Sequence, residues 1–181
     1  MILAIEKAFD IFEELRINTL KKTDMLSKEQ LHFKPSDNSW SITETLHHLY
    51  LSELGTYTYM NKKIQGADNL NKSGFKEAWN TFLLKVMLRS PAKFKLPKKA
   101  PIVPTGDMAY GDLVEQWNQL RKDFAELLNQ FDVESAKKLS FKHPRIGYIN
   151  AHQTISFLRE HFKHHLKQLD RIKNDAGFPK G

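Results

Sequence analysis

The chain has 181 residues, of which 40% are hydrophobic and 27% are charged, and 28 Lys and Arg against 21 Asp and Glu give a net charge of +7. This composition excludes a disordered or collagen-like chain, and the length favours one domain over residues 1–181. The chain has no cysteine. Disulfides, thiolate metal sites and a cysteine nucleophile are therefore excluded, and any metal must be held by His, Asp or Glu.

The beginning of the chain carries no targeting signal that we can identify. Met1–Ile5 is apolar, but Glu6 and Lys7 follow at once, and no basic leader precedes an apolar run. We therefore expect no signal peptide. Because no apolar stretch approaches the roughly 20 residues of a membrane span, we expect a cytoplasmic protein with no membrane partner.

The positive charge could indicate nucleic acid, an anionic membrane or acidic small molecules as partners. The densest basic cluster consists of Lys93, Lys95, Lys98 and Lys99, in a connection that contains prolines. The sequence has no RNA-binding aromatic signature, no zinc finger and no obvious recognition helix. We interpret the cluster as a solvated basic loop and expect no nucleic-acid partner.

Five segments carry apolar residues three and four positions apart, the spacing of an amphipathic helix. They are residues 2–22, 41–66, 75–90, 107–130 and 150–174. We expect short helical turns at 27–31 and 133–139, and a long irregular connection over 92–106. Since no segment alternates convincingly as a strand does, the sequence predicts an all-α bundle.

The segment 75–90 is the most aromatic of the five. Phe75, Trp79 and Phe82 follow its helical pattern, which ends near Ser90 and Pro91. We interpret these aromatic residues as part of the core rather than as a platform for a cofactor.

The last helical segment contains the motif H-x-x-x-H. Asn150 and Gln153 have the spacing of a capping box at its start. His161 and His165 lie four residues apart on one flank of the apolar stripe, whereas His164 points away from it. A divalent metal can bridge two such histidines. The alternative is a pair of partly solvated histidines at a helix edge.

The segment 41–66 carries two adjacent histidines, His47 and His48. Ser41 and Glu44 have the spacing of a capping box at its start. Helix phase places His48 on a flank of small polar residues and His47 toward leucines. Phase alone does not decide which of them faces a site, and each can be an ordinary hydrogen-bonded histidine.

In their order, these motifs resemble the DinB-like (YfiT) superfamily. The resemblance covers essentially the whole chain. It implies an antiparallel four-helix bundle, often a homodimer, with a three-histidine site for a divalent metal, commonly zinc or nickel. The residues that carry it are Phe33-Lys34-Pro35, Trp40-Ser41-Ile42, His48-Leu49, Glu53, His143-Pro144-x-x-Gly147 and His161-x-x-x-His165-x-x-Gln168.

Carried onto this sequence, the resemblance implies His48, His161 and His165 as the metal ligands. It selects His48 over His47 because His48 directly precedes Leu49 and stands in register with the other motif residues. We expect Gln168, one turn beyond His165, to support a ligand or to touch substrate, and it is our catalytic candidate.

The nearest carboxylates in sequence, Glu44 and Glu53, are plausible participants in the chemistry of such a site. A glutamate on a surface helix is usually only solvated, so we assign neither of them a role.

Three neutral imidazoles leave a coordination position open, which is typical of catalytic zinc. A metal there can lower the pKa of a bound water, polarise a carbonyl or ionise a thiol. Characterised members of the superfamily include S-transferases and isomerases that use a low-molecular-weight thiol such as bacillithiol or mycothiol, and others are labelled metal-dependent hydrolases. We therefore expect a thiol-dependent S-transferase acting on small electrophiles. The alternatives are a hydrolase that uses a metal-bound water and a non-enzymatic, stress-associated binding bundle.

Overall fold

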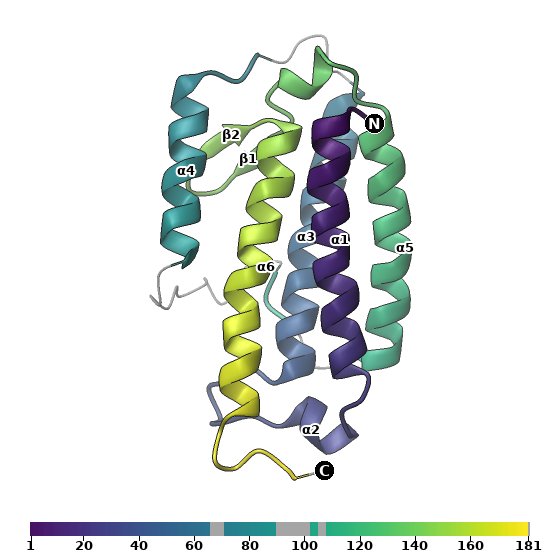
Figure 1. Cartoon of the computed structure of the whole chain (residues 1–181), viewed down its shortest axis with the longest axis vertical. Coiled ribbons are helices and arrows are strands. Elements are labelled where there is room, and N and C mark those ends of the chain that lie inside the picture. Colours follow the sequence, from purple (N-terminus) through teal and green to yellow (C-terminus); the bar gives the residue numbers. More distant parts are fainter. Residues whose placement is uncertain (66–70, 90–101, 105–107, 181) are drawn as a thin grey trace.

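The computed structural model describes residues 1–65, 71–89, 102–104 and 108–180 (Figure 1). Four long helices lie side by side in it: α1 (Leu3–Thr23), α3 (Ile42–Ile64), α5 (Tyr110–Asn129) and α6 (Ala151–Lys173). α6 contacts α1 and α3, and α5 contacts the same two helices from the other side. α1 and α6 run in one direction and α3 and α5 in the other (Figure 1). The expected four-helix bundle is confirmed.

Capping boxes set the starts of the two helices that carry the candidate ligands. At α3 the Ser41 hydroxyl accepts from the backbone N–H of Glu44, whose carboxylate accepts from the Ser41 N–H in return. Asn150 and Gln153 make the same reciprocal pair at α6. Each box satisfies two backbone donors that a helix start leaves unpaired, so each helix begins where the sequence predicts it.

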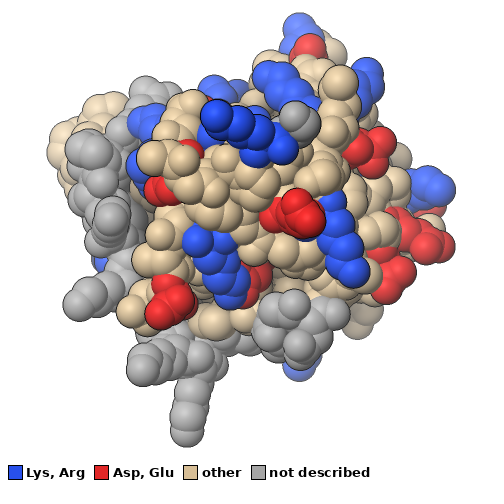
Figure 2. Space-filling model, turned by 90° about the horizontal axis from the view of Figure 1, so that it is seen from below, with Lys and Arg blue, Asp and Glu red and all other residues tan. Residues whose placement is uncertain are grey.

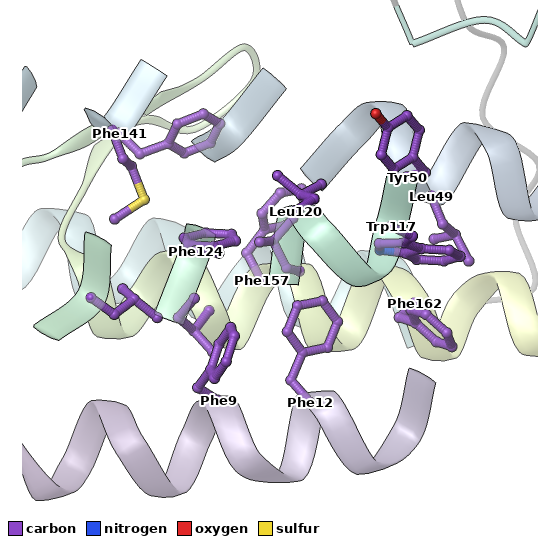
Figure 3. Packing of buried hydrophobic residues seen from close by; sticks show 14 of the residues in the cluster. Phe9, Phe12, Leu49, Tyr50, Trp117, Leu120, Phe124, Phe141, Phe157 and Phe162 are labelled. Atoms are coloured by element: carbon purple, nitrogen blue, oxygen red, sulfur yellow. The ribbon is translucent and has the colours of Figure 1, made fainter. Parts of the chain in front are cut away.

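The core lies between the four long helices, where each contributes large apolar side chains (Figure 3). The ring of Phe12 meets that of Phe162 edge-on at 6.0 Å between centroids. Phe9 meets Phe124 at 5.9 Å, and Trp117 packs on Phe162 at 6.0 Å. Burial of each such side chain contributes about 1.5–3 kcal/mol. Helices α1, α5 and α6 are thereby held together around the aromatic layer.

A small hairpin joins the bundle just before α6. Its strands, β1 (Phe141–His143) and β2 (Gly147–Ile149), are antiparallel, and Gly147 has a positive φ of 78°, which suits glycine. The sequence predicts no strand, because strands of three residues are too short for alternation to be recognised. The turn expected at 133–139 contains the 3-10 helix η2 (Ser135–Lys137).

Helix α4 (Phe75–Arg89) stands outside the bundle, against α6 and β2 (Figure 1). Its buried residues Thr81 and Leu84 lie on the side opposite Phe75, Trp79 and Phe82, which are 84%, 51% and 54% exposed. The expectation that these aromatic residues belong to the core is therefore wrong. The four positions around the core are taken by the long helices, and the described side of α4 that is covered carries Thr81 and Leu84.

The remaining short helix, α2 (Lys28–His32), follows α1 at one end of the bundle (Figure 1). None of the helices in the described ranges is both long enough and apolar enough to cross a membrane. Of the connection expected over 92–106, only residues 102–104 belong to the described part of the chain.

Candidate metal centre

The side chains of His48, His161 and His165 meet between α3 and α6. The Nε2 atom of His161 lies 3.3 Å from Nε2 of His48 and 3.1 Å from Nε2 of His165. One potential ligand atom from each of the three lies within 4.8 Å of the other two. The structure thus brings together the three residues that the sequence analysis selects, and their role as metal ligands stays a prediction.

The outer nitrogens of two of these rings are held by oxygen atoms. Nδ1 of His48 lies 2.7 Å from the backbone carbonyl oxygen of Ile102, and Nδ1 of His165 lies 2.9 Å from Oε1 of Gln168. Since these oxygens only accept, each Nδ1 carries the proton and each Nε2 presents a lone pair. The assignment at His165 depends on the amide orientation of Gln168, in which Oε1 rather than Nε2 faces Nδ1.

The Nε2 atoms of His48 and His165 therefore both direct lone pairs at His161, which can supply only one N–H proton to them. Nε2 of His161 can donate one proton to one of its two neighbours, and the other lone pair is left facing nitrogen. A cation among the three Nε2 atoms would satisfy them all. Zinc–nitrogen bonds of 2.0–2.1 Å with tetrahedral angles place two ligand nitrogens about 3.3 Å apart, which agrees with the observed 3.1 and 3.3 Å. The two separations that involve His161 fit a tetrahedral divalent ion, and the third pair of ligand atoms lies within 4.8 Å.

All three imidazoles are neutral at pH 7. Burial, reinforced by the neighbouring imidazoles, places the pKa of His161 well below 6.5. Burial and the nearby His48 lower the pKa of His165 to about 3. Burial also lowers the pKa of His48, and its hydrogen bond to Ile102 opposes part of that shift. Neutral imidazole is the form that binds a metal.

Two aromatic rings border the cluster. Trp40 lies 4.9 Å from the His48 ring and stacks at 6.4 Å on His165, while Phe157 stacks at 5.7 Å on His161. Trp40 belongs to the family motif, but Phe157 was not anticipated. It lies on the side of α6 away from the apolar stripe, where its burial depends on the outer elements that pack against α6. The helical pattern alone gives no signal for that contact.

The histidine next to the proposed ligand lies elsewhere. The buried ring of His47 stacks on Tyr50 at 6.3 Å and is not part of the cluster. The structure thereby resolves the ambiguity that helix phase leaves open between His47 and His48.

His143 has a separate, local environment in the hairpin. Its Nδ1 accepts from the backbone N–H groups of Arg145 and Ile146, which shapes the turn between β1 and β2. Its ring lies 4.5 Å from Phe157, so the hairpin reaches the aromatic border of the cluster through this histidine.

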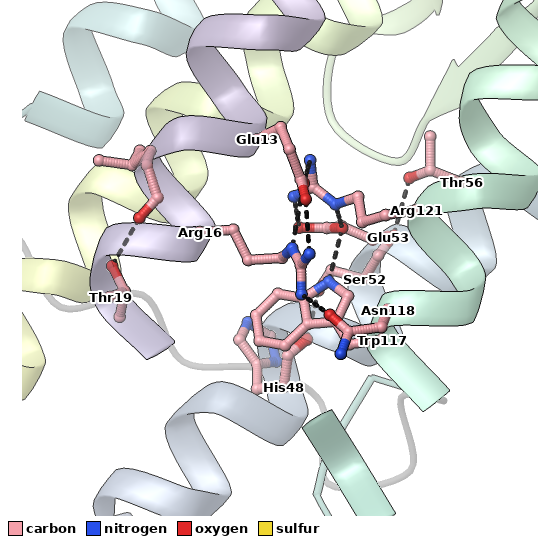
Figure 4. Close-up of polar contacts among 11 residues, drawn as sticks. Glu13, Arg16, Thr19, His48, Ser52, Glu53, Thr56, Trp117, Asn118 and Arg121 are labelled. Atoms are coloured by element: carbon pink, nitrogen blue, oxygen red, sulfur yellow. Dashed lines mark hydrogen bonds and ion pairs between the residues drawn. The ribbon is translucent and has the colours of Figure 1, made fainter. Parts of the chain in front are cut away.

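The two candidate carboxylates are engaged away from the histidines. Glu44 caps α3 and pairs with Lys34 at 2.7 Å. Glu53 is 2% exposed, which overturns its expected solvation, and it accepts from Trp117 Nε1 at 2.8 Å and from Arg121 Nη2 at 2.8 Å (Figure 4). The sequence gives no sign of this buried ion pair, because its partners lie more than sixty residues away.

The ion pair continues into a network on α1. Arg121 Nη1 lies 3.2 Å from Glu13, although the geometry is too poor for a hydrogen bond. Arg16 pairs with Glu13 and donates to the Asn118 side chain at 2.8 Å. The network thus ties α1, α3 and α5 together beside the histidine cluster (Figure 4).

The carbonyl of Ile102 is the contributor that sequence reasoning could not find. Every residue carries a backbone carbonyl, so no residue type marks the one that lies against His48. The sequence predicts only an irregular connection over 92–106, and most of that connection, residues 92–101 and 105–106, lies outside the described part.

Comparison with known proteins agrees with this architecture. A family model described as the DinB superfamily matches residues 11–169. Protein YuaE of Bacillus subtilis (strain 168), which is described as uncharacterized, is 29% identical over 172 residues, covering 90% of this chain and 95% of YuaE. The solved structure of YfiT from Bacillus subtilis, described as a probable metal-dependent hydrolase with an unusual four-helix bundle topology, matches with a TM-score of 0.61 at 17% identity. That match covers 97% of this chain and 89% of YfiT.

Proposed function

Because the chain belongs to the DinB superfamily, we propose that its three-histidine cluster binds a divalent ion and that the protein is a metal-dependent hydrolase of a small molecule. The observation that carries this proposal is the convergence of three neutral imidazole nitrogens at the spacing of tetrahedral ligands. The description of the similarly folded YfiT as a probable metal-dependent hydrolase supports the same reaction class.

The chain's own residues would hold and orient the ion. When bound, a divalent ion at such a site acts as a Lewis acid and lowers the pKa of a water or thiol that reaches it. His48 and His165 keep their Nε2 lone pairs inward because the Ile102 carbonyl and Gln168 hold the Nδ1 protons. Trp40 packs beside these two rings and restricts their orientations.

For Gln168 we propose a positioning role rather than contact with the reacting atoms. Its Oε1 accepts from His165 Nδ1, so the amide fixes both the tautomer and the angle of that ring. Such partners of metal-binding histidines raise the basicity of the ligand.

The first test is the metal content of protein purified without an affinity tag. We expect about one divalent ion per chain in the wild type and none in His161→Ala. His47→Ala is the matched control, because this buried histidine adjoins a proposed ligand but lies outside the cluster. Wild type without metal after incubation with zinc and nickel would overturn the proposal, as would a His161→Ala variant that keeps its ion.

The second test is turnover of small esters and amides by the zinc- and nickel-loaded protein. We expect hydrolysis that a chelator abolishes and that the same metal restores, and that is absent in His161→Ala. A protein that binds its metal but turns over none of these compounds would contradict the hydrolase proposal and leave the S-transferase and the non-enzymatic binding bundle.

One observation favours a thiol-dependent S-transferase as the second candidate. The carboxylates of Glu44 and Glu53 are both engaged elsewhere, so neither can act as the general base of a hydrolase. A thiol that ionises at the metal needs no such base. The two activities separate by co-substrate: a transferase consumes an aryl halide only when a thiol such as bacillithiol is supplied, whereas a hydrolase cleaves its ester without one.

A further inference from the structure

The outer side of α4 is a continuous apolar surface. Its large apolar residues follow one another at intervals of one to four positions, which places them along one side of the helix. The opposite side, with Thr81 and Leu84, is buried. The exposed residues, which we call the α4 face, are Phe75 (84%), Trp79 (51%), Phe82 (54%), Leu83 (42%) and Val86 (50%).

The size of the α4 face marks it as functional. A whole aromatic side chain presents about 150–250 Å², so the exposed parts of the five residues together amount to roughly 500 Å². The largest apolar patch on a typical monomer is about 300–600 Å² and is often a binding site. Singly exposed hydrophobic residues need no explanation, but a stripe of five along one helix does.

The same part of the chain carries all of the net charge. Residues 71–100 contain eight Lys and Arg and one acidic residue, Glu77, so their net charge is +7. The remaining residues contain 20 Lys and Arg and 20 Asp and Glu, which balance. Where the molecule is coloured by charge and seen from below, positive and negative side chains are interspersed (Figure 2).

Basic residues accompany the α4 face along the helix. Lys72 precedes α4, and Lys76, Lys85 and Arg89 lie within it. An apolar face on a helix whose sequence also contains lysines and arginine is the pattern of a helix that lies in the interface of an anionic bilayer.

We propose that α4 docks the protein onto an anionic membrane surface. The α4 face enters the boundary between headgroups and acyl chains, and the net positive charge of residues 71–89 is attracted to the lipid phosphates. The helix lies on the bilayer rather than across it, in agreement with the lack of a spanning helix in the described part. The expectation of no membrane partner rests on spanning length and on treating the basic residues apart from any apolar surface. The α4 face supplies that surface.

A second copy of the chain fits this face less well than a bilayer does. A stable interface buries about 800 Å² per partner, more than the roughly 500 Å² that the α4 face offers. A two-fold contact through α4 would also bring two copies of residues 71–89 together, each with a net charge of +3 and with Glu77 as its one acidic residue. Anionic lipid complements both the shape and the charge of the face.

Flotation of the full-length protein with lipid vesicles tests the proposal. We expect the wild type to float with vesicles of phosphatidylcholine containing 30% phosphatidylglycerol, to bind pure phosphatidylcholine at least tenfold more weakly, and to be released by 0.5 M NaCl. The Trp79→Ser/Phe82→Ser variant should lose at least tenfold of the binding. Both side chains are exposed, so the fold does not depend on them.

The matched control is Leu3→Ser/Val133→Ser, which removes two side chains that are 63% and 61% exposed outside α4. Equal loss of binding in both variants, no binding of the wild type, or equal binding to neutral vesicles would overturn the proposal. So would a wild-type dimer that Trp79→Ser/Phe82→Ser converts to monomers while vesicle binding stays absent. The metal content of Trp79→Ser/Phe82→Ser should equal that of the wild type. A failure of the membrane proposal can therefore be distinguished from a failure of the proposed metal site.

Discussion

Two buried polar clusters share helix α3 and differ in what completes them. Around Glu53 two carboxylates and two guanidinium groups balance one another within the chain. Around His48 three imidazole nitrogens face one another with at most one proton between two neighbours. A buried cluster that balances its own charges serves the fold, whereas one that leaves lone pairs opposed requires a partner from outside.

The two clusters also differ in protonation: the groups around Glu53 are charged, and the three histidines are neutral. Burial raises the pKa of Glu53, while Arg121 and the Trp117 N–H oppose the rise by bonding the ionised form. Burial lowers the pKa of the three histidines, and their neighbours add to the shift because they are also bases. Charge is retained in the first cluster and excluded from the second until a cation enters it.

The largest expected effect comes from breaking the self-contained cluster. Arg121→Met leaves the carboxylate of Glu53 buried without its partner, and we expect a loss of about 3–5 kcal/mol in the free energy of unfolding, measured by urea titration. The double variant Arg121→Met/Glu53→Gln should recover part of that loss, because it removes the stranded charge. A loss below about 1 kcal/mol in the single variant would contradict a structural role for the pair.

Binding of a metal ion to the histidine cluster should instead stabilise the folded chain. An ion that binds only the folded chain raises the free energy of unfolding by about 2.7 kcal/mol at one hundred times its dissociation constant and about 4.1 kcal/mol at one thousand times. We expect this rise for the wild type with zinc, measured by thermal or urea unfolding, and its reversal by a chelator. His161→Ala should gain nothing, and a gain equal to that of the wild type would place the ion elsewhere.

The buried imidazole of His143 lies outside both clusters, and its lowered pKa should make the stability of the protein depend on pH. Burial, followed by the charge of Arg145, lowers the pKa of His143 from 6.5 to about 4. The unfolded chain therefore binds this proton first, and the free energy of unfolding falls as the pH drops from about 6.5 to about 4. A pKa shift from 6.5 to about 4 corresponds to about 3 kcal/mol. Urea titrations of metal-free protein should give a shallower pH dependence for His143→Gln, and parallel curves would refute the assignment.

The smallest expected effect comes from removing the hydrogen bond between Gln168 and the proposed ligand His165. Gln168→Ala removes the acceptor of His165 Nδ1–H, and we expect zinc affinity to fall 10- to 100-fold, or about 1.4–2.7 kcal/mol. Competition with a chromophoric chelator measures it. Gln168→Glu, which retains an acceptor, should keep the affinity, and Gln119→Ala on the surface of α5 is the control. Equal affinity in Gln168→Ala and wild type would remove Gln168 from the site.

The helices and most of the site could be predicted because their signals are local. Ser41 with Glu44 and Asn150 with Gln153 define the helix starts, and the spacing of His161 and His165 places both rings on one side of α6. The choice between His47 and His48 needed the family motif, because two adjacent residues differ by only about 100° around a helix.

The rest could not be predicted because it depends on tertiary contacts. The Ile102 carbonyl has no residue type to mark it, and Glu53 meets Arg121 from a distant helix. The pattern of α4 identifies an apolar side through Trp79 and Phe82, but a pattern does not say whether the bundle covers that side. Amphipathicity predicts a buried side and leaves its partner undefined.

The distance along the chain from each capping box to its histidine has an evolutionary consequence. His48 follows Ser41 by seven residues and His161 follows Asn150 by eleven, which are close to two and three whole turns. One inserted or deleted residue in either interval would swing the ring by about 100° around its helix and carry it out of the cluster. Related chains can therefore exchange amino acids within these intervals but cannot change their length, and two conserved gap-free blocks should flank loops of freely varying size.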